Sequence, residues 1–369
     1  MRYDMQSITR ACIHMERANS NLRKEDVAMK KFLSLTLAAL MMASVLAGCG
    51  GSKEEPAKTE EPAKQEETQA PASTGTELKF TTGGSSGTYF AFGSVLAGQV
   101  SSSTGSKVTA VEGKGSQGNI ELMDMDGAQL GFVQSDVMSY AYDGTNLFAD
   151  MGKVDCFSTV AALYMEQVQI VTCDPTIKTV ADLAGKNVSV GDSGSGVYYN
   201  AVDVLGAYGL DIEKDINPTY QGFGDSAEAL KDGKIDAAFV VAGAPTTAIT
   251  ELASSKDTYL VSLDQEHIDA LIAESPYYSA YTIPADAYGL ESDTTTVAVG
   301  AVVIARDDVS EEDVYNFCAG VFDNIDAITA VHAKGGELNL DFATSVTSVP
   351  YHAGAAKYFA EKGYTVPTK

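Results

Sequence analysis

A glycine- and serine-rich turn occurs twice in this chain, each time between an apolar strand-like segment and an apolar helix-like segment. The first copy is residues 83–88 and the second is residues 191–196. A second matching segment follows each copy, at 126–134 and 232–240. One α/β arrangement used twice predicts two similar lobes. Backbone N–H groups at two helix starts then predict a cleft that holds a ligand from both sides.

Strand-like and helix-like segments alternate from residue 77 to the end of the chain. The strand-like segments are 78–82, 107–111, 130–133, 157–163, 168–173, 187–190, 237–241, 259–261 and 296–304. The helix-like segments are 87–102, 117–125, 134–141, 179–184, 195–208, 224–231, 244–253, 264–273, 310–332 and 350–362. This alternation predicts two open α/β sheets, in which ligands bind at the carboxyl ends of the strands.

The first 76 residues predict export and anchoring. Residues 29–48 contain a short basic start, an apolar run and small residues before Cys49, a pattern typical of a signal peptide and similar to the bacterial lipobox. The lipobox resemblance implies that Cys49 is lipidated. The alternative is an anchoring or buried helix, but the apolar run is too short to span a bilayer. Residues 1–28 fit neither role and indicate an early start codon. Residues 49–76 predict a disordered tether.

Charge and cysteine content restrict the partners. The chain has 25 basic and 50 acidic residues, so nucleic acid and anionic lipid head groups are poor partners. Of Cys156, Cys173 and Cys318, at least one must be unpaired within the chain. A Cys156–Cys173 disulfide and free thiols are both open.

Several motifs together are similar to one family. They are residues 82–89, 131–136, 182–186, 191–196, 232–237 and 349–355. They resemble the TAXI family of extracytoplasmic solute receptors of TRAP transporters, and the resemblance covers 77–366. It implies an α/β, two-lobe periplasmic-binding-protein-like (Venus flytrap) fold with a hinge, joined by crossing strands. It also implies delivery of the solute to a sodium- or proton-driven permease. Several members bind glutamate or related small carboxylates.

The same resemblance predicts the domain limits. Lobe I is expected to comprise 77–163 plus 266–369, including the C-terminal helices, and lobe II to comprise 164–265. The protein is expected to bind without chemistry and without a cofactor.

The expected ligand is a small carboxylate or amino acid, such as glutamate, glutamine or a dicarboxylate. After residue 49 the only arginine is Arg306, in a segment typical of a surface turn, so an arginine fork is not expected to hold it. N–H groups and hydroxyls at the two helix starts would bind the anion. The candidate binding residues are Gly84, Ser85, Gly87, Thr88, Tyr89, Ser116, Gln134, Ser135, Ser193, Gly194, Ser195, Gly196, Val197, Tyr198 and Gly243.

Simpler interpretations of these residues stay open. Both turns are also compatible with ordinary tight βα turns. Gln134 could donate to a carboxylate and accept from an ammonium group, or could simply cap a helix. Val197 stands where the first turn has Thr88, which leaves the ligand head group open.

Rival functions have weaker support. Residues 191–194 resemble the nucleophile segment of chymotrypsin-like proteases, with Ser193 as the nucleophile. Those proteases place the catalytic base upstream, and the only upstream histidine here is His14. Residues 113–118 match a lone dinucleotide fingerprint. No calcium loop or His/Cys cluster is present, although a structural ion held by scattered carboxylates stays open. An ABC-importer receptor is the nearest alternative, followed by a surface hydrolase or an adhesin.

Overall fold

The computed structural model describes residues 77–369, apart from the side chain of Leu147, and they fall within one compact unit that ends at Lys369. The expected early start, signal peptide, lipidated Cys49 and tether lie outside the described residues. Among the helices that the structure describes, none combines the length and the apolar character that a bilayer crossing requires.

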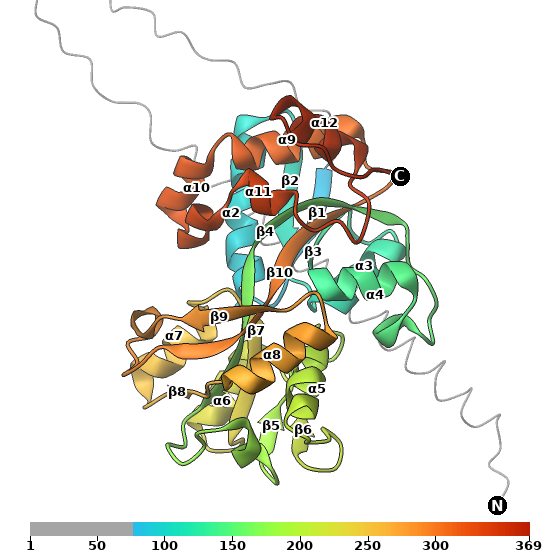
Figure 1. The fold of residues 1–369 in the computed structure, drawn as a ribbon. Helices are drawn as coiled ribbons and strands as arrows, with labels where there is room; N and C mark the ends of the chain where they lie inside the picture. The colour runs from blue at the N-terminus through green and yellow to red at the C-terminus, as the bar shows by residue number, and fades with distance from the viewer. Residues whose placement is uncertain (1–76) are drawn as a thin grey trace, which may run out of the picture. The chain divides into compact units, whose positions relative to one another are not determined.

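One twisted sheet forms the centre of the fold (Figure 1). Its strand order is β2-β1-β3-β10-β4-β7-β5-β6, with β8 beside β4 and β9 beside β10. The strands are β1 (Glu77–Thr81), β2 (Lys107–Val111), β3 (Leu130–Gln134), β4 (Phe157–Thr172), β5 (Asn187–Ser189), β6 (Asn217–Thr219), β7 (Ala237–Ala242), β8 (Tyr259–Leu260), β9 (Ser279–Ile283) and β10 (Thr294–Arg306). The short strands β6 and β9 are absent from the sequence prediction.

Helices cover the sheet in both lobes. The α-helices are α2 (Thr88–Ser103), α3 (Ser116–Asp124), α4 (Ser135–Asp143), α5 (Val197–Ala207), α6 (Phe223–Lys231), α7 (Thr247–Ser255), α8 (Gln265–Glu274), α9 (Glu311–Phe322), α10 (Ile325–Val331), α11 (Leu340–Ala343) and α12 (Ala353–Glu361). Single 3₁₀ turns are η1 (Asn146–Phe148), η2 (Val180–Leu183), η3 (Ala285–Ala287) and η4 (Ala333–Glu337). The expected helix at 179–184 is therefore a 3₁₀ turn.

Two long strands connect the lobes (Figure 1). The first half of β4 pairs with β10, whereas its second half pairs with β7; β10 similarly pairs with β3 near its end and with β9 near its start. The expected division of β4 into 157–163 and 168–173 is wrong. Polar residues interrupt its apolar pattern, but they are buried and bonded: Gln169 Nε2 donates to the carbonyl oxygen of Ala242 (3.1 Å). These crossing strands confirm the expected two-lobe, periplasmic-binding-protein-like α/β fold.

The continuous β4 also shows that Cys156 and Cys173 do not form a disulfide. Cys156 and Cys173 lie at its opposite ends, and sixteen residues at about 3.3 Å each separate them by roughly 50 Å. Both are free thiols, as is the buried Cys318.

The packing suggests a different lobe boundary. Ile268, Leu271 and Tyr278 belong to the same buried cluster as Val188 and Val204 of lobe II. Along β10, this cluster includes Val299, whereas Ala301 belongs to the core of lobe I. We therefore propose that lobe II extends to about residue 299 rather than ending at 265, and that lobe I resumes at Gly300.

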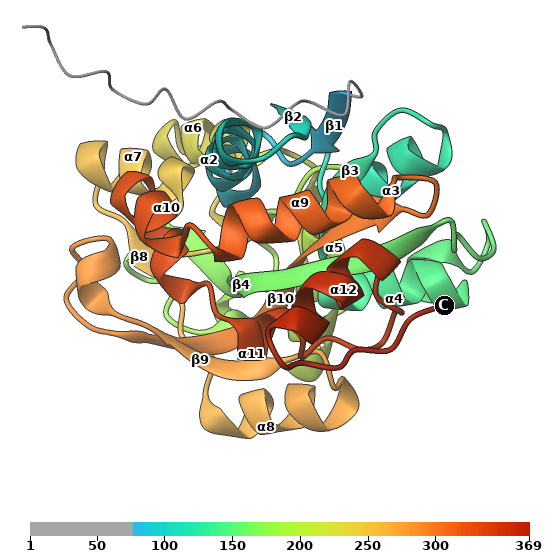
Figure 2. The same ribbon diagram turned by 90° about the horizontal axis from the view of Figure 1, so that it is seen from above.

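The C-terminal helices complete lobe I (Figure 2). Helices α9 and α12 pack against each other, and α9 also packs against α2. The expected single helix over 310–332 is divided, because Asp323 ends α9 and Asn324 leaves the helical conformation before α10 begins. Gly320 allows α9 to approach α2 closely: a Cβ there would lie 2.8 Å from the Cα of Val100.

This close approach predicts opposite effects of alanine at two helical glycines. Gly320→Ala should lower the free energy of unfolding by about 1–3 kcal/mol, because backbone atoms must move. The exposed Gly98 in α2 has open space around its Cβ direction, so Gly98→Ala should raise stability by roughly 0.5–1 kcal/mol. Urea unfolding of both variants measures the difference, and equal effects would contradict the close helix contact.

Candidate functional site

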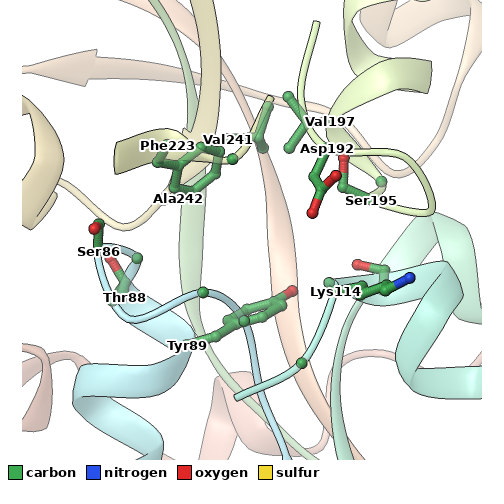
Figure 3. Close-up of a pocket in the computed structure, with 18 of the residues that line it drawn as sticks. Ser86, Thr88, Tyr89, Lys114, Asp192, Ser195, Val197, Phe223, Val241 and Ala242 are labelled. Carbon is green, nitrogen blue, oxygen red and sulfur yellow. The ribbon is translucent and has the colours of Figure 1, made fainter. Parts of the chain in front are cut away.

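A cavity of about 250 Å³ lies between the two lobes (Figure 3). Lobe I contributes the turn at 83–89 and the loop at 112–116, while lobe II contributes parts of 192–197 and 222–225 and the end of β7. In Figure 3, Tyr89 lies on one side of the space and Val197 and Phe223 on the other. Both copies of the repeated turn therefore meet at one cavity of a size suited to a small solute.

The first turn places the start of α2 at the cavity. The N–H of Gly87 donates to the carbonyl oxygen of Gly84 (3.0 Å), which closes the turn, and no side chain caps the helix at Gly87. The first N–H groups of α2 can therefore bind an anion. The hydroxyl of Thr88 instead donates across the cleft to the carbonyl oxygen of Gly243 (2.9 Å).

The second turn requires glycine at two positions. Gly191 and Gly194 have φ of 90° and 86°, a region that L side chains rarely adopt. Helix α5 begins at Val197, and no side chain caps it at Gly196. A Cβ on Gly196 would overlap Oε1 of Gln134, so this glycine permits the lobes to meet.

The structure brings most of the candidate binding residues to the cavity. Those that line it are Gly84, Ser85, Gly87, Thr88, Tyr89, Ser116, Gln134, Ser195, Gly196 and Val197. Those that do not line it are Ser135, Ser193, Gly194, Tyr198 and Gly243.

The residues outside the cavity have other contacts. Ser193, Gly194 and Tyr198 line a neighbouring hollow that shares Lys114, Asp192 and Ser195 with the cavity. A position in or next to the second turn therefore does not by itself bring a residue to the cavity. Ser135 Oγ is buried and accepts from the N–H of Gly300 (3.1 Å), and the Gly243 carbonyl accepts from Thr88. Arg306 lies away from the cavity, paired with Asp126 and Asp308.

Direct hydrogen bonds hold the lobes together around the cavity. Nε2 of Gln134 donates to Oδ1 of Asn200 in α5 (2.9 Å), and the N–H of Gly118 donates to the carbonyl oxygen of Gly194 (2.9 Å). With the Thr88 contact, these bonds define a closed arrangement of the lobes. Gln134 therefore uses its side-chain amide to join the lobes, and its Oε1 is packed against Gly196.

A buried carboxyl lies behind this contact. Nδ2 of Asn200 donates to Asp136 Oδ2 (3.2 Å) and to the Oη of Tyr278 (2.8 Å), which itself donates to Asp203 (2.8 Å). Burial raises the pKa of Asp136 to about 6, and the nearby Asp203 adds to the rise, while bonds from Asn200 and the backbone oppose it. Asp136 thus joins the two lobes, but its ionised form is disfavoured because the carboxyl is buried.

The most informative cavity residue missed from the sequence is Glu166. It lies in the crossing strand β4, is only 2% exposed, and accepts a hydrogen bond from Tyr89 Oη at Oε2 (2.7 Å). A lone acid within a long apolar segment was a signal for it, because acids are rarely buried without a partner or a function. Other lining residues absent from the prediction include Glu112, Lys114, Asp192, Phe223 and Asp225.

The described residues contain no group of three His, Cys, Asp or Glu side chains arranged to hold a metal ion. The carboxylates at the cavity come from separate elements, and they are considered below as contacts for an organic solute.

Comparison with models of protein families identifies the family of this chain. A model of the NMT1-like family matches residues 80–363, which include both glycine turns, both crossing strands and every lining residue of the cavity. The chain belongs to the NMT1-like family. Neither a TAXI nor a TRAP assignment is part of that match.

Several solved structures are similar to this NMT1-like chain. The periplasmic aliphatic sulphonate binding protein SsuA from Escherichia coli is 17% identical, with 80% of this chain and 91% of that chain covered and a TM-score of 0.41. A binding protein component of an ABC phosphonate transporter from Pseudomonas aeruginosa is 14% identical, with coverages of 71% and 79% and a TM-score of 0.44. A Salmonella typhimurium periplasmic binding protein with high arginine specificity is 12% identical, with coverages of 71% and 98% and a TM-score of 0.42.

The contact at Gly196 predicts that alanine there keeps the NMT1-like protein open. Gly196→Ala should disfavour the closed form by about 1–3 kcal/mol, because the new Cβ would overlap Gln134. The matched control is Gly206→Ala in the same helix, where a Cβ would meet open space. Small-angle scattering should give a larger radius of gyration for Gly196→Ala than for the control. Identical radii would show that Gly196 does not limit closure.

The buried acid predicts a pH-dependent effect of Asp136→Asn. Because the folded pKa of Asp136 is raised to about 6 from 3.8, the native state holds more protons than the unfolded state between these values. Wild-type stability is therefore lost as pH rises through this window. The stability gain of Asp136→Asn should grow from pH 4 to pH 6, by roughly 1.4 kcal/mol for each increase of one in pH, and then level off.

Urea unfolding at pH 4, 5, 6 and 7 tests this dependence. Asp143→Asn, at the exposed end of the same helix, provides the reference profile. A gain for Asp136→Asn that is independent of pH would contradict a buried, titrating Asp136.

Proposed function

We propose that this chain is an extracytoplasmic receptor that binds a small solute between its lobes and presents the closed form to a membrane permease. The observation that carries the proposal is the cavity itself: uncapped starts of α2 and α5 meet there from opposite lobes, while β4 and β10 connect the lobes behind it. Such an arrangement lets one solute contact both lobes, so binding favours closure.

We further propose that the solute carries a carboxylate. The unbonded first N–H groups of α2 and α5 and the positive ends of both helix dipoles favour an anionic group at this position. Hydroxyl groups of Ser85 and Ser195 at the cavity can add hydrogen bonds. Glutamate, glutamine and short dicarboxylates are the proposed ligand set, and a volume of about 250 Å³ suits molecules of this size.

The proposed membrane partner is the permease of a TRAP transporter, on the strength of the TAXI-like motifs. A receptor for an ABC importer is the second candidate, because the same two-lobe architecture serves both transporter classes. The product of the neighbouring gene distinguishes them: a multi-span permease supports TRAP, and an ATP-hydrolysing subunit supports an ABC importer. Anchoring through a lipid on Cys49 is part of the same proposal.

A thermal-shift screen of the full chain tests the receptor function. The set contains C4 to C6 dicarboxylates, acidic amino acids and their amides. A bound ligand at 100 times its dissociation constant should stabilise the protein by about 2.7 kcal/mol and raise its melting temperature by a few degrees. The ligand should be recovered unchanged. Consumption of the ligand would favour a hydrolase, and the absence of any shift at millimolar concentration would remove this ligand set.

A further inference from the structure

The cavity lining contains a buried acid that forms no salt bridge within the described residues. Glu166 is 2% exposed and lines the cavity, and its Oε2 accepts from Tyr89 Oη (2.7 Å). Within the part of the chain that the structure describes, its Oε1 accepts no hydrogen bond. An ionised carboxylate is costly to bury unless a positive group is close. A cation supplied by the solute would remove that cost.

The cavity wall has an excess of negative charge. Besides Glu166, the acids Glu112, Asp192 and Asp225 line it, whereas Lys114 is the single basic residue of the lining. Two carboxylates of a dicarboxylic acid would therefore enter a field that already repels one of them. A solute with one carboxylate and one ammonium group suits both the helix starts and this field.

The buried lysine whose charge acts on Glu166 already has an acidic partner. Lys334, 3% exposed, donates from Nζ to Glu337 Oε1 (2.5 Å) and lies 5.4 Å from the ring centre of Tyr164. Its charge lowers the pKa of Glu166, but burial outweighs it and raises that pKa to about 8. Asp136 raises the pKa further, and the hydrogen bond from Tyr89 lowers it.

Two more acceptors point to the same kind of ligand group. Gln134 Oε1 and Ser195 Oγ are buried and, within the described residues, have no hydrogen-bond partner, and both residues line the cavity. One N–H of the Gln134 amide is used by Asn200, and its Oε1 lies against the backbone of Gly196. An ammonium group has three donors and no acceptor, which matches unsatisfied acceptors.

We propose that the cavity binds the protonated primary amine of a small aliphatic solute, with Glu166 as its counter-ion. This inference rests on the proposed receptor function and narrows its ligand class to amine-bearing solutes of up to about six carbons. Glu166 then sets specificity, because it discriminates an amino acid from the corresponding dicarboxylic acid.

The proposal has a protonation signature. In the empty protein near pH 7, a carboxyl with a raised pKa holds its proton; an arriving ammonium group favours the ionised form, and that proton passes to the buffer. Binding of the amine should therefore release protons. Titration calorimetry in two buffers of different ionisation enthalpy measures this release directly, independently of the affinity.

The experiment compares four probes on the full chain: glutamate, 5-aminopentanoate, pentane-1,5-diamine and glutarate, which has no amine. Glutamate and 5-aminopentanoate should bind at least about tenfold more tightly than glutarate, because glutarate leaves Glu166 without a cation. Glu166→Gln should weaken the amine-bearing probes about 30-fold and abolish proton release. Glu228→Gln removes an exposed charge from α6 outside the cavity lining and should change affinity less than threefold.

The outcomes separate the two proposals. Tight binding of glutarate that is unaffected by Glu166→Gln would overturn the ammonium site while supporting a carboxylate receptor. Equal losses in Glu166→Gln and Glu228→Gln would assign the preference to general charge and overturn the role of Glu166. Absence of binding by all three amines also overturns the proposal. An unchanged melting temperature of the free Glu166→Gln protein, or an increase, shows that the variant is folded.

Discussion

The antiparallel pairing of β4 with β10 is the constraint on which the other features depend. Both strands are almost entirely buried, and each belongs to lobe I over part of its length and to lobe II over the rest. Because the sheet continues through both lobes, the strand ends that carry the two glycine turns face one shared space. The cavity therefore lies where the two lobes meet, and the crossing strands form its back.

Closure of the lobes is based on polar groups rather than on a second apolar core. Gln134, Asn200 and Asp136 connect the lobes through hydrogen bonds that are inaccessible to solvent. Such bonds contribute little net free energy in the closed form, but they must be replaced by water when the lobes separate. This balance is consistent with the opening and closing that the proposed receptor function requires. Glu166 fits the same pattern, as a buried group whose partner is expected to come from outside the protein.

Local sequence patterns predicted most elements and failed at identifiable places. The turns at 83–88 and 191–196 were recognisable because glycine and serine combine there with flanking apolar segments. The division of β4 into two strands was wrong, since Glu166 and Gln169 look like surface residues in sequence although their partners are distant in the chain. The break after α9 was missed for a related reason: the apolar pattern continues across Asp323.

The duplicated α/β arrangement, the positions of the glycine turns and most helices and strands could be predicted from the amino-acid sequence, because they depend on local conformational preference and apolar periodicity. The folded arrangement was needed to show that Ser193 and Tyr198 lie outside the cavity and that Glu166 lines it. It was also needed to show that Gln134 uses its donor on Asn200. These outcomes depend on the relative placement of two lobes, and residues far apart in the chain carry no local signal of such contacts.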